Sequence, residues 1–307
     1  MPREPCAAGQ FYPADPEKLK ELIKKCFLDK FGPGKMPNNS QDKSSQNKKN
    51  RKNKMIGAVV PHAGYIFSGP CAAHSYKAIA ESEKADLYII LGTGHSCAYT
   101  CFSGEDFDTP LGTAKNSPEF CKILKSSGIR QDNSAHHGEH SIEVQIPFLQ
   151  HIFDNKFNFV PIIIGSGGIE EIKETAEKIN RSIKEYNLFK ENAHDTGRKI
   201  IVICSSDFTH YGSSYGYVPF EDNIKEKLYQ LDERAIIFIK KQDAEGFLDY
   251  CEETGATICG KHAIAVLIEA LKNRKNRIDL LKYYMSADIL GDYSSAVGYG
   301  SMIIERA

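Results

Sequence analysis

Histidines follow three of the apolar runs in this chain, at the point where each run ends. They are His62, His95 and His210, in the segments PHAGY, GTGHS and SSDFTH. An imidazole can ligate a metal ion, and near neutral pH it can also give or take a proton. Ligands of open α/β sheets gather beyond the carboxyl ends of the strands. We therefore expect the three imidazoles to share one site.

Two further segments carry groups of the same kind. His140 and Glu143 stand three residues apart at the start of a helical pattern, so they would share a face suited to a metal or a proton relay. Glu139 and Ser141 beside them also fit ordinary helix capping. Cys259 precedes another helical pattern, where the helix dipole would lower the pKa of its thiol. The remaining eight cysteines form no CxxC pair and are expected to pack as small apolar side chains.

Together these residues permit two kinds of site. Two imidazoles and a thiolate suit zinc, copper or iron, and the second nitrogen of a liganding imidazole could be oriented by Asp207 or Glu143. The same groups suit nucleophilic catalysis, with Cys259 attacking and His210 or His62 as its base. The spacing leaves both interpretations open. The chain has no GxxxxGK[ST], and its GTG turn lacks the later glycine of GxGxxG, so phosphate-loop and dinucleotide sites are excluded.

The elements that must position these residues alternate between strands and helices. The expected strands are 56–60, 87–91, 157–164, 200–204, 280–285 and 296–304. The expected helices are one beginning at Asp15-Pro16-Glu17 and those at 69–80, 118–126, 142–153, 169–186, 222–240 and 262–272. Nearly continuous apolar strands indicate a sheet buried on both faces, and the last two strands have no evident helix between them. We predict a single three-layer α/β/α domain over residues 1–307, with a mixed, mostly parallel sheet.

Composition and charge narrow the class of protein. Hydrophobic residues make up 41% of the 307, and the formal charge is -1, so no global basic field favours nucleic acid as a partner. No apolar run is long enough to span a membrane, and residues 1–10 do not resemble a secretory signal. These features predict a cytoplasmic protein. Residues 35–54 carry seven Lys or Arg against one Asp, which predicts a disordered low-complexity insertion, and its 48–54 cluster also fits a nuclear import signal.

The chain resembles the MEMO family, named for mediating ErbB-driven cell motility. The resemblance extends in order over nearly the whole chain and rests on the segments REPCAAGQFYPADPEKL, PHAGYIFSGPCAAHSY, LGTGHS, DTPLGT, EHSIEVQIPFL, SSDFTHYG, TICGKHAI and SSAVGYGSM. That family is similar to the class III extradiol dioxygenases, whose iron is held by two His and a Glu in an α/β fold. The resemblance therefore implies the same fold here.

The resemblance also implies a set of site residues. The metal ligands fall on His62, His95 and Cys259, with the cysteine at the position of the dioxygenase glutamate. His210 and His140 would line the same cleft and, with Asp207, form the catalytic set. Iron or copper is implied in preference to zinc.

Two functions are implied for such a protein. One is metal-dependent redox chemistry with oxygen, without ring-cleaving dioxygenase activity. The other is a non-catalytic adaptor in motility signalling that binds phosphotyrosine peptides or signalling proteins through the same cleft. A phosphopeptide calls for arginine, and the matching motifs bring only Lys261 near the cleft. The residues therefore favour the metal site.

Overall fold

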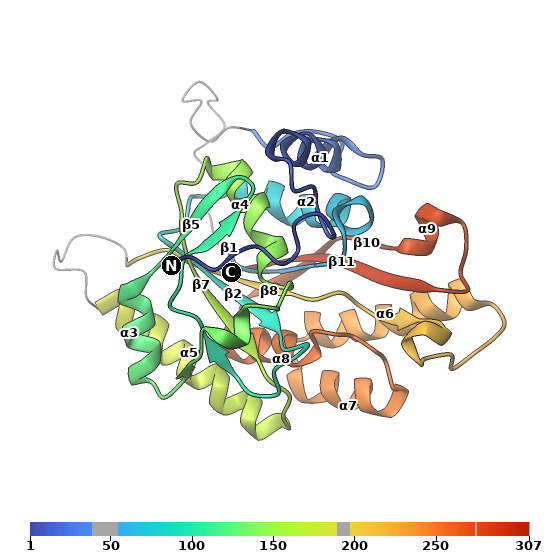
Figure 1. Cartoon of the computed structure of the whole chain (residues 1–307). Coiled ribbons are helices and arrows are strands. Elements are labelled where there is room, and N and C mark those ends of the chain that lie inside the picture. The colour runs from blue at the N-terminus through green and yellow to red at the C-terminus, as the bar shows by residue number, and fades with distance from the viewer. Residues whose placement is uncertain (39–54, 189–196, 274, 307) are drawn as a thin grey trace.

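A computed structural model describes residues 1–38, 55–188, 197–273 and 275–306. One sheet runs through these residues, and helices lie on both of its faces (Figure 1). The strands are β1 (Met55–Val60), β2 (Leu87–Thr93), β3 (Cys101–Phe102), β4 (Phe107–Thr109), β5 (Gly112–Asn116), β6 (Arg130–Gln131), β7 (Asn158–Ile164), β8 (Ile200–Ser205), β9 (His210–Tyr211), β10 (Arg277–Met285) and β11 (Ala296–Glu305). The helices are α1 (Pro16–Leu28), α2 (Tyr65–Glu81), α3 (Pro118–Ser126), α4 (Ile146–Phe153), α5 (Ile169–Leu188), α6 (Ile224–Lys240), α7 (Ala244–Thr254), α8 (Lys261–Ala270) and α9 (Ser286–Leu290).

The centre of the sheet is parallel. Strands β1, β8, β2 and β7 are neighbours in that order, and each adjacent pair runs in the same direction. Strands β11 and β10 extend the sheet beyond β1 as an antiparallel pair, while β3 lies antiparallel to β7 on the other side. The predicted mixed sheet with a closing antiparallel pair is confirmed. The carboxyl ends of the four central strands therefore meet at one edge.

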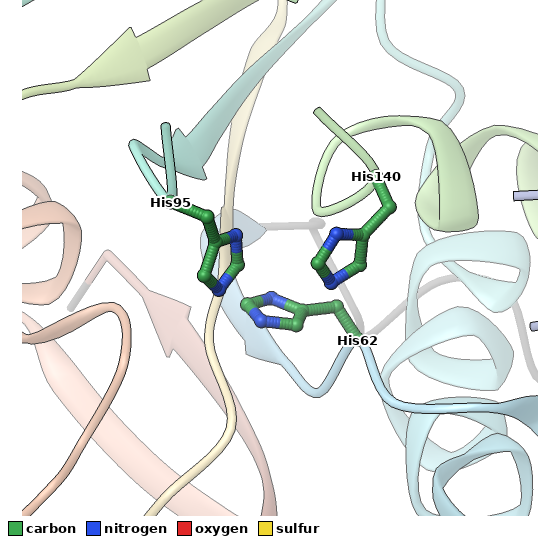
Figure 2. A group of neighbouring side chains, drawn as sticks. All are labelled: His62, His95 and His140. Carbon is green, nitrogen blue, oxygen red and sulfur yellow. The ribbon is translucent and has the colours of Figure 1, made fainter. Parts of the chain in front are cut away.

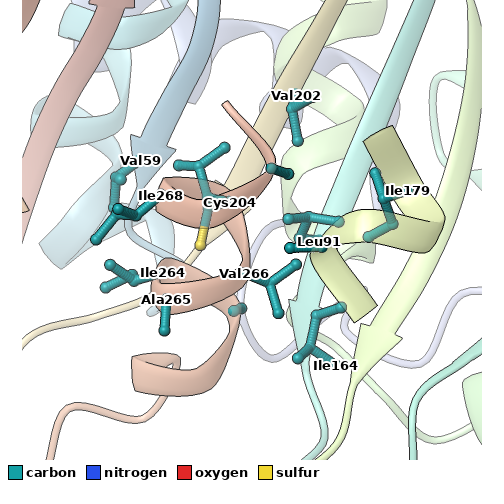
Figure 3. Close-up of a cluster of buried hydrophobic side chains, with 14 of the residues drawn as sticks. Val59, Leu91, Ile164, Ile179, Val202, Cys204, Ile264, Ala265, Val266 and Ile268 are labelled. Atoms are coloured by element: carbon teal, nitrogen blue, oxygen red, sulfur yellow. The ribbon is translucent and has the colours of Figure 1, made fainter. Parts of the chain in front are cut away.

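Each face of the sheet has its own helical layer, which confirms the three-layer α/β/α fold. Helix α2 packs on β1, β10 and β11, and α1 and α4 lie against it. Helix α8 packs on β2, β7 and β8, with α5 and α7 against it, and Figure 3 shows its apolar side chains among those of the strands. Alternate residues of β8 serve the two layers: Val202 and Cys204 belong to the α8 core, Ile201 and Ile203 to the α2 core.

Two helix starts show how local sequence signals set the elements. Asp15 caps α1 by accepting a hydrogen bond from the Lys18 peptide N–H at 2.8 Å, and Pro16 occupies the first turn. Ser117 caps α3 in the same way through the Phe120 peptide N–H. Both helices begin where the sequence predicts.

Two helices were not expected from the sequence. Asp243 caps α7 through the Gly246 peptide N–H at 3.0 Å, and Phe247 and Cys251 point into the core one helical turn apart. The short α9 lies between β10 and β11, where no helix was predicted. No helix within the described ranges is long and apolar enough to cross a bilayer. The lysine-rich segment 35–54 lies outside the described residues, except for its first four positions.

Candidate metal centre

Three imidazoles from distant parts of the chain meet beyond the carboxyl ends of the central strands. His62 follows β1, His95 follows β2, and His140 lies in the loop that precedes α4 (Figure 2). One ring nitrogen of each lies within 4.8 Å of the other two. The His62 ring meets the other two nearly at right angles, while the rings of His95 and His140 stack with centroids 4.6 Å apart. This arrangement could hold one metal ion.

A second group of donors shares His62. Its other members are Asp207 and Cys259, again with ligand atoms within 4.8 Å of one another. The Cys259 Sγ lies 3.2 Å from Nε2 of His62. His62 thus belongs to both groups, the first completed by His95 and His140 and the second by Asp207 and Cys259.

Hydrogen bonds fix the tautomer of His62. Its Nδ1 lies 3.1 Å from the Ser205 hydroxyl, which donates its single proton to the Ser141 carbonyl at 2.6 Å and accepts from the Gln145 amide at 2.7 Å. A hydroxyl has one proton to give. Because Ser205 has already donated that proton, Nδ1 of His62 must donate to the hydroxyl. The lone pair of Nε2 is therefore left for a metal ion or a proton.

Glu139 orients His95 in a comparable way. Its carboxylate accepts from Nδ1 of His95 at 3.0 Å, from the His95 peptide N–H at 3.0 Å and from the Ser141 peptide N–H at 2.7 Å. Burial opposes the charge of this carboxylate, but these bonds and the nearby His95 outweigh burial and hold the pKa of Glu139 at about 2. The carboxylate holds the proton on Nδ1, so in the neutral tautomer of His95 it is Nε2 that is free to act as a ligand.

His210 lies in the same pocket and has the same orientation of its ring nitrogens. Its Nδ1 lies 3.0 Å from the Thr257 carbonyl oxygen, which can only accept, so Nε2 is again the free nitrogen. His62, His95, His140 and His210 all line one pocket of about 490 Å³, together with Asp207. The four predicted histidines and Asp207 are therefore brought together.

Burial and mutual proximity keep the inner imidazoles neutral. His62 is 2% exposed, and burial, followed by the neighbouring His140 and His95, lowers its pKa well below the ordinary value. Burial and His95 likewise lower the pKa of His140. Neutral imidazole is the form that binds metal ions.

The thiol of Cys259 behaves differently from the expectation. Burial, followed by the charge of Asp207, raises the pKa of Cys259 above its ordinary value, so the predicted lowering by the dipole of α8 was wrong. The thiol is thus neutral in the metal-free protein, which disfavours the nucleophilic alternative. Gly260 brings Cys259 to this place, since a Cβ there would lie 2.5 Å from Cβ of Ser206. All nine cysteines are free; seven are buried, and Cys6 and Cys259 are half-buried.

The two carboxylates expected to orient imidazole rings do not do so. Asp207 accepts from the peptide N–H of His62 at 2.8 Å and not from its ring. Glu143 is one helical turn from His140, but it accepts from the Arg3 guanidinium at 2.6 Å and from the Tyr12 hydroxyl. Glu143 therefore ties the N-terminal segment to the loop and takes no part in a proton relay with His140.

Arg3 holds the loop that carries Glu139 and His140. Its guanidinium donates to the carbonyl oxygens of His136 at 2.6 Å and Glu139 at 2.8 Å, in addition to its ion pair with Glu143. Both members of that ion pair are fully buried. The N-terminal segment thus holds the loop of the site through Arg3 and lines the pocket through Phe11.

Over nearly its whole length, the chain is similar to proteins of one family. The family model described as "Memo-like protein" matches residues 3–303. The chain belongs to the Memo-like family. A MEMO1 family protein of Methanopyrus kandleri is 36% identical over 312 residues, covering all of both chains. A MEMO1 family protein of Saccharolobus solfataricus is 37% identical over 304 residues, covering 97% of this chain and 98% of the relative.

Three residues of this Memo-like chain that hold the candidate site in place are not evident from its sequence. The sequence suggests helix capping for Glu139, places Ser205 directly after the predicted strand 200–204, and assigns no role to Arg3. Only Glu139 carried a usable signal, because a carboxylate next to a candidate ligand histidine is a common orienting partner. Ser205 and Arg3 act through the fold, which places them beside residues 143 and 140 positions away.

Proposed function

We propose that this Memo-like protein binds a redox-active transition-metal ion and uses it in redox chemistry with oxygen. The ligands would be Nε2 of His62, Nε2 of His95 and Sγ of Cys259. The observation that carries the proposal is the orientation of the two imidazoles, whose Nδ1 atoms are both committed to Ser205 and Glu139. Such partners on the second nitrogen are the usual support of a metal-binding imidazole.

In this proposal the ion is iron or copper because of the family resemblance, since the donor set by itself suits zinc as well. When bound, such an ion would supply one-electron steps between a reductant and oxygen. A thiolate in place of a carboxylate departs from the two-histidine, one-carboxylate set that opens iron for oxygenase chemistry. We therefore expect no ring cleavage. His140 is a competing third ligand, because one of its ring nitrogens lies within 4.8 Å of ring nitrogens of His62 and His95.

The remaining residues of the pocket would handle protons. His210 presents a free Nε2 to the pocket, because its Nδ1 is bound to the Thr257 carbonyl, so it can take or give a proton there. His140 is held against the Phe11 ring, with centroids 4.3 Å apart, and can do the same. Burial raises the pKa of Asp207, which suits this carboxyl to hold a proton.

The test is a metal titration of matched variants. Anaerobic dialysis against Fe(II) or Cu, followed by elemental analysis of desalted protein, should give one ion per chain for the native protein. His62→Ala, His95→Ala and Cys259→Ser should each lose that ion and the oxygen consumption that it supports with ascorbate. His137→Ala is the control, because this exposed side chain pairs with Glu105 outside the pocket.

The outcome separates the candidate functions. If His140→Ala loses the metal and Cys259→Ser keeps it, the third ligand is the His140 imidazole and not the Cys259 thiol. If all the variants bind metal as the native protein does, the redox proposal is refuted and the histidine-lined pocket is better explained as the cleft of an adaptor. That adaptor is the weaker proposal, since no Lys or Arg is among the described residues that line the pocket.

A further inference from the structure

The pocket in front of the histidines has aromatic walls. Phe11, Phe67, Tyr215 and Tyr299 line it, with Leu290 and Val297 completing the apolar surface. Tyr215 and Leu290 remain 44% and 61% exposed, so they stand at the mouth. A volume of about 490 Å³ is within the usual range for a small organic ligand. The walls therefore suit a compact molecule with an aromatic ring.

The same lining holds two carboxyl groups, and no Lys or Arg is among its described residues. Asp207 is 3% exposed beside the histidines, and Asp292 is exposed at the mouth. The Asp292 carboxylate accepts from the peptide N–H of Ser294 at 2.8 Å and from its hydroxyl at 3.0 Å. These bonds lower the pKa of Asp292, so it is ionised at neutral pH. At the mouth, an anionic group would meet this carboxylate, and no Lys or Arg among the described lining residues would offset it.

We propose that this pocket binds a compact aromatic molecule that carries a protonated amine, with the ring among the aromatic walls and the amine at Asp292. This inference rests on the proposed function only in taking the histidine pocket as the functional site. Aromatic faces attract cations as well as rings, so Tyr215 and Asp292 at the mouth favour the same end of the ligand. At the mouth, the pocket therefore favours a ligand whose outer end is cationic over one whose outer end is phosphorylated.

The test compares three probes of one skeleton. Phenethylamine, 2-phenylethanol and 3-phenylpropionate differ mainly in the charge of the end group, and calorimetric titration of the full-length protein as purified gives their affinities. The expected order is amine, then alcohol, then carboxylate. Asp292→Asn should lower the affinity for phenethylamine by about two- to fivefold, which is the effect of losing an exposed ion pair. The affinity for 2-phenylethanol should not change.

Two further variants make the result specific. Tyr215→Ala removes an exposed wall residue and should weaken amine and alcohol alike. Asp154→Asn removes a carboxylate that is 90% exposed outside the pocket and should change neither. The inference is overturned if the amine has no advantage over the alcohol, or if Asp292→Asn leaves that advantage intact.

The metal titration keeps this result separate from the proposed function. Asp292→Asn and Tyr215→Ala should retain the metal content of the native protein. Native protein that ranks the probes as expected but binds no metal would support the pocket ligand and refute the redox centre. Metal binding without the ranking would do the reverse.

Discussion

Replacing Arg3 by methionine should destabilise the protein and loosen its metal site together. Methionine keeps the apolar stem but removes the guanidinium, which is buried and bound to Glu143, to the His136 carbonyl and to the Glu139 carbonyl. Breaking a buried ion pair costs about 3 to 5 kcal/mol. The lower end applies here, because the Glu143 carboxylate keeps its bonds from Tyr12 and from two peptide N–H groups.

The two carbonyls that lose a donor add about 1 kcal/mol to that cost. The free energy of unfolding should therefore fall by about 4 kcal/mol, and the thermal midpoint by roughly 8 to 16 °C. Chemical denaturation followed by circular dichroism measures the first, and calorimetry the second. Metal affinity should fall in the same variant, since Arg3 holds the loop that carries Glu139.

Arg130→Met is the matched control. Arg130 also pairs with an aspartate, Asp132 at 3.0 Å, and lies over an aromatic ring, but its side chain is 63% exposed. Its loss should cost at most about 1 kcal/mol. The double variant Arg3→Met/Glu143→Gln should recover part of the loss, since it leaves no buried charge unpaired. Equal costs for the two arginine variants would refute the assignment of a structural role to the buried pair.

Three further predictions concern the groups around the metal ligands. Glu139→Gln should lower metal affinity about 10- to 100-fold, measured by competition with a chelator. The pKa of Glu139 is about 2 in the folded protein against an ordinary 4.5, so its ionised carboxylate stabilises the fold above pH 4.5. This stabilisation is lost as the pH falls toward 2. The urea midpoints at pH 5 and pH 3 should therefore differ less in Glu139→Gln than in the native protein. Metal binding through Cys259 should release one proton, because burial raises the pKa of the thiol and the thiol must lose its proton to bind. Calorimetric titration with metal in two buffers of different ionisation enthalpy would detect the released proton. Proton release that persists in Cys259→Ser would contradict the prediction. Asp207→Asn should weaken metal binding about 10- to 100-fold, because Asp207 holds the His62 backbone. Complete loss of the metal ion from this variant in dialysis would indicate instead that Asp207 is itself a ligand.

The fold was predictable because its signals are local. Apolar runs mark the central strands, and capping residues such as Asp15 and Ser117 mark helix starts within a few positions. The position of His62, His95 and His210 after strand-forming runs then predicted a shared pocket through the topology of parallel sheets. Helix α7 shows the limit, since its cap at Asp243 follows α6 so closely that one pattern runs into the next.

The chemistry of the site was harder to predict, because it depends on burial and on contacts between distant segments. The dipole of α8 predicted a lowered pKa for Cys259, and the burial of that thiol reversed the sign. Glu143 lies one turn from His140 in sequence, but the N-terminal segment occupies its carboxylate. Glu139 fitted a helix cap equally well by sequence, and only the fold shows its bond to His95.

The proposed ligands also link parts of the chain that are far apart. His62 and Cys259 are separated by 197 positions, and His95 comes from a third connection. An ion bound to all three would act as a removable cross-link between these connections, and any motion that separates them would first have to break a coordination bond. Unfolding of the loaded protein would then be slow as well as unfavourable. Protease half-life at a fixed temperature would consequently report metal occupancy without any assay of turnover.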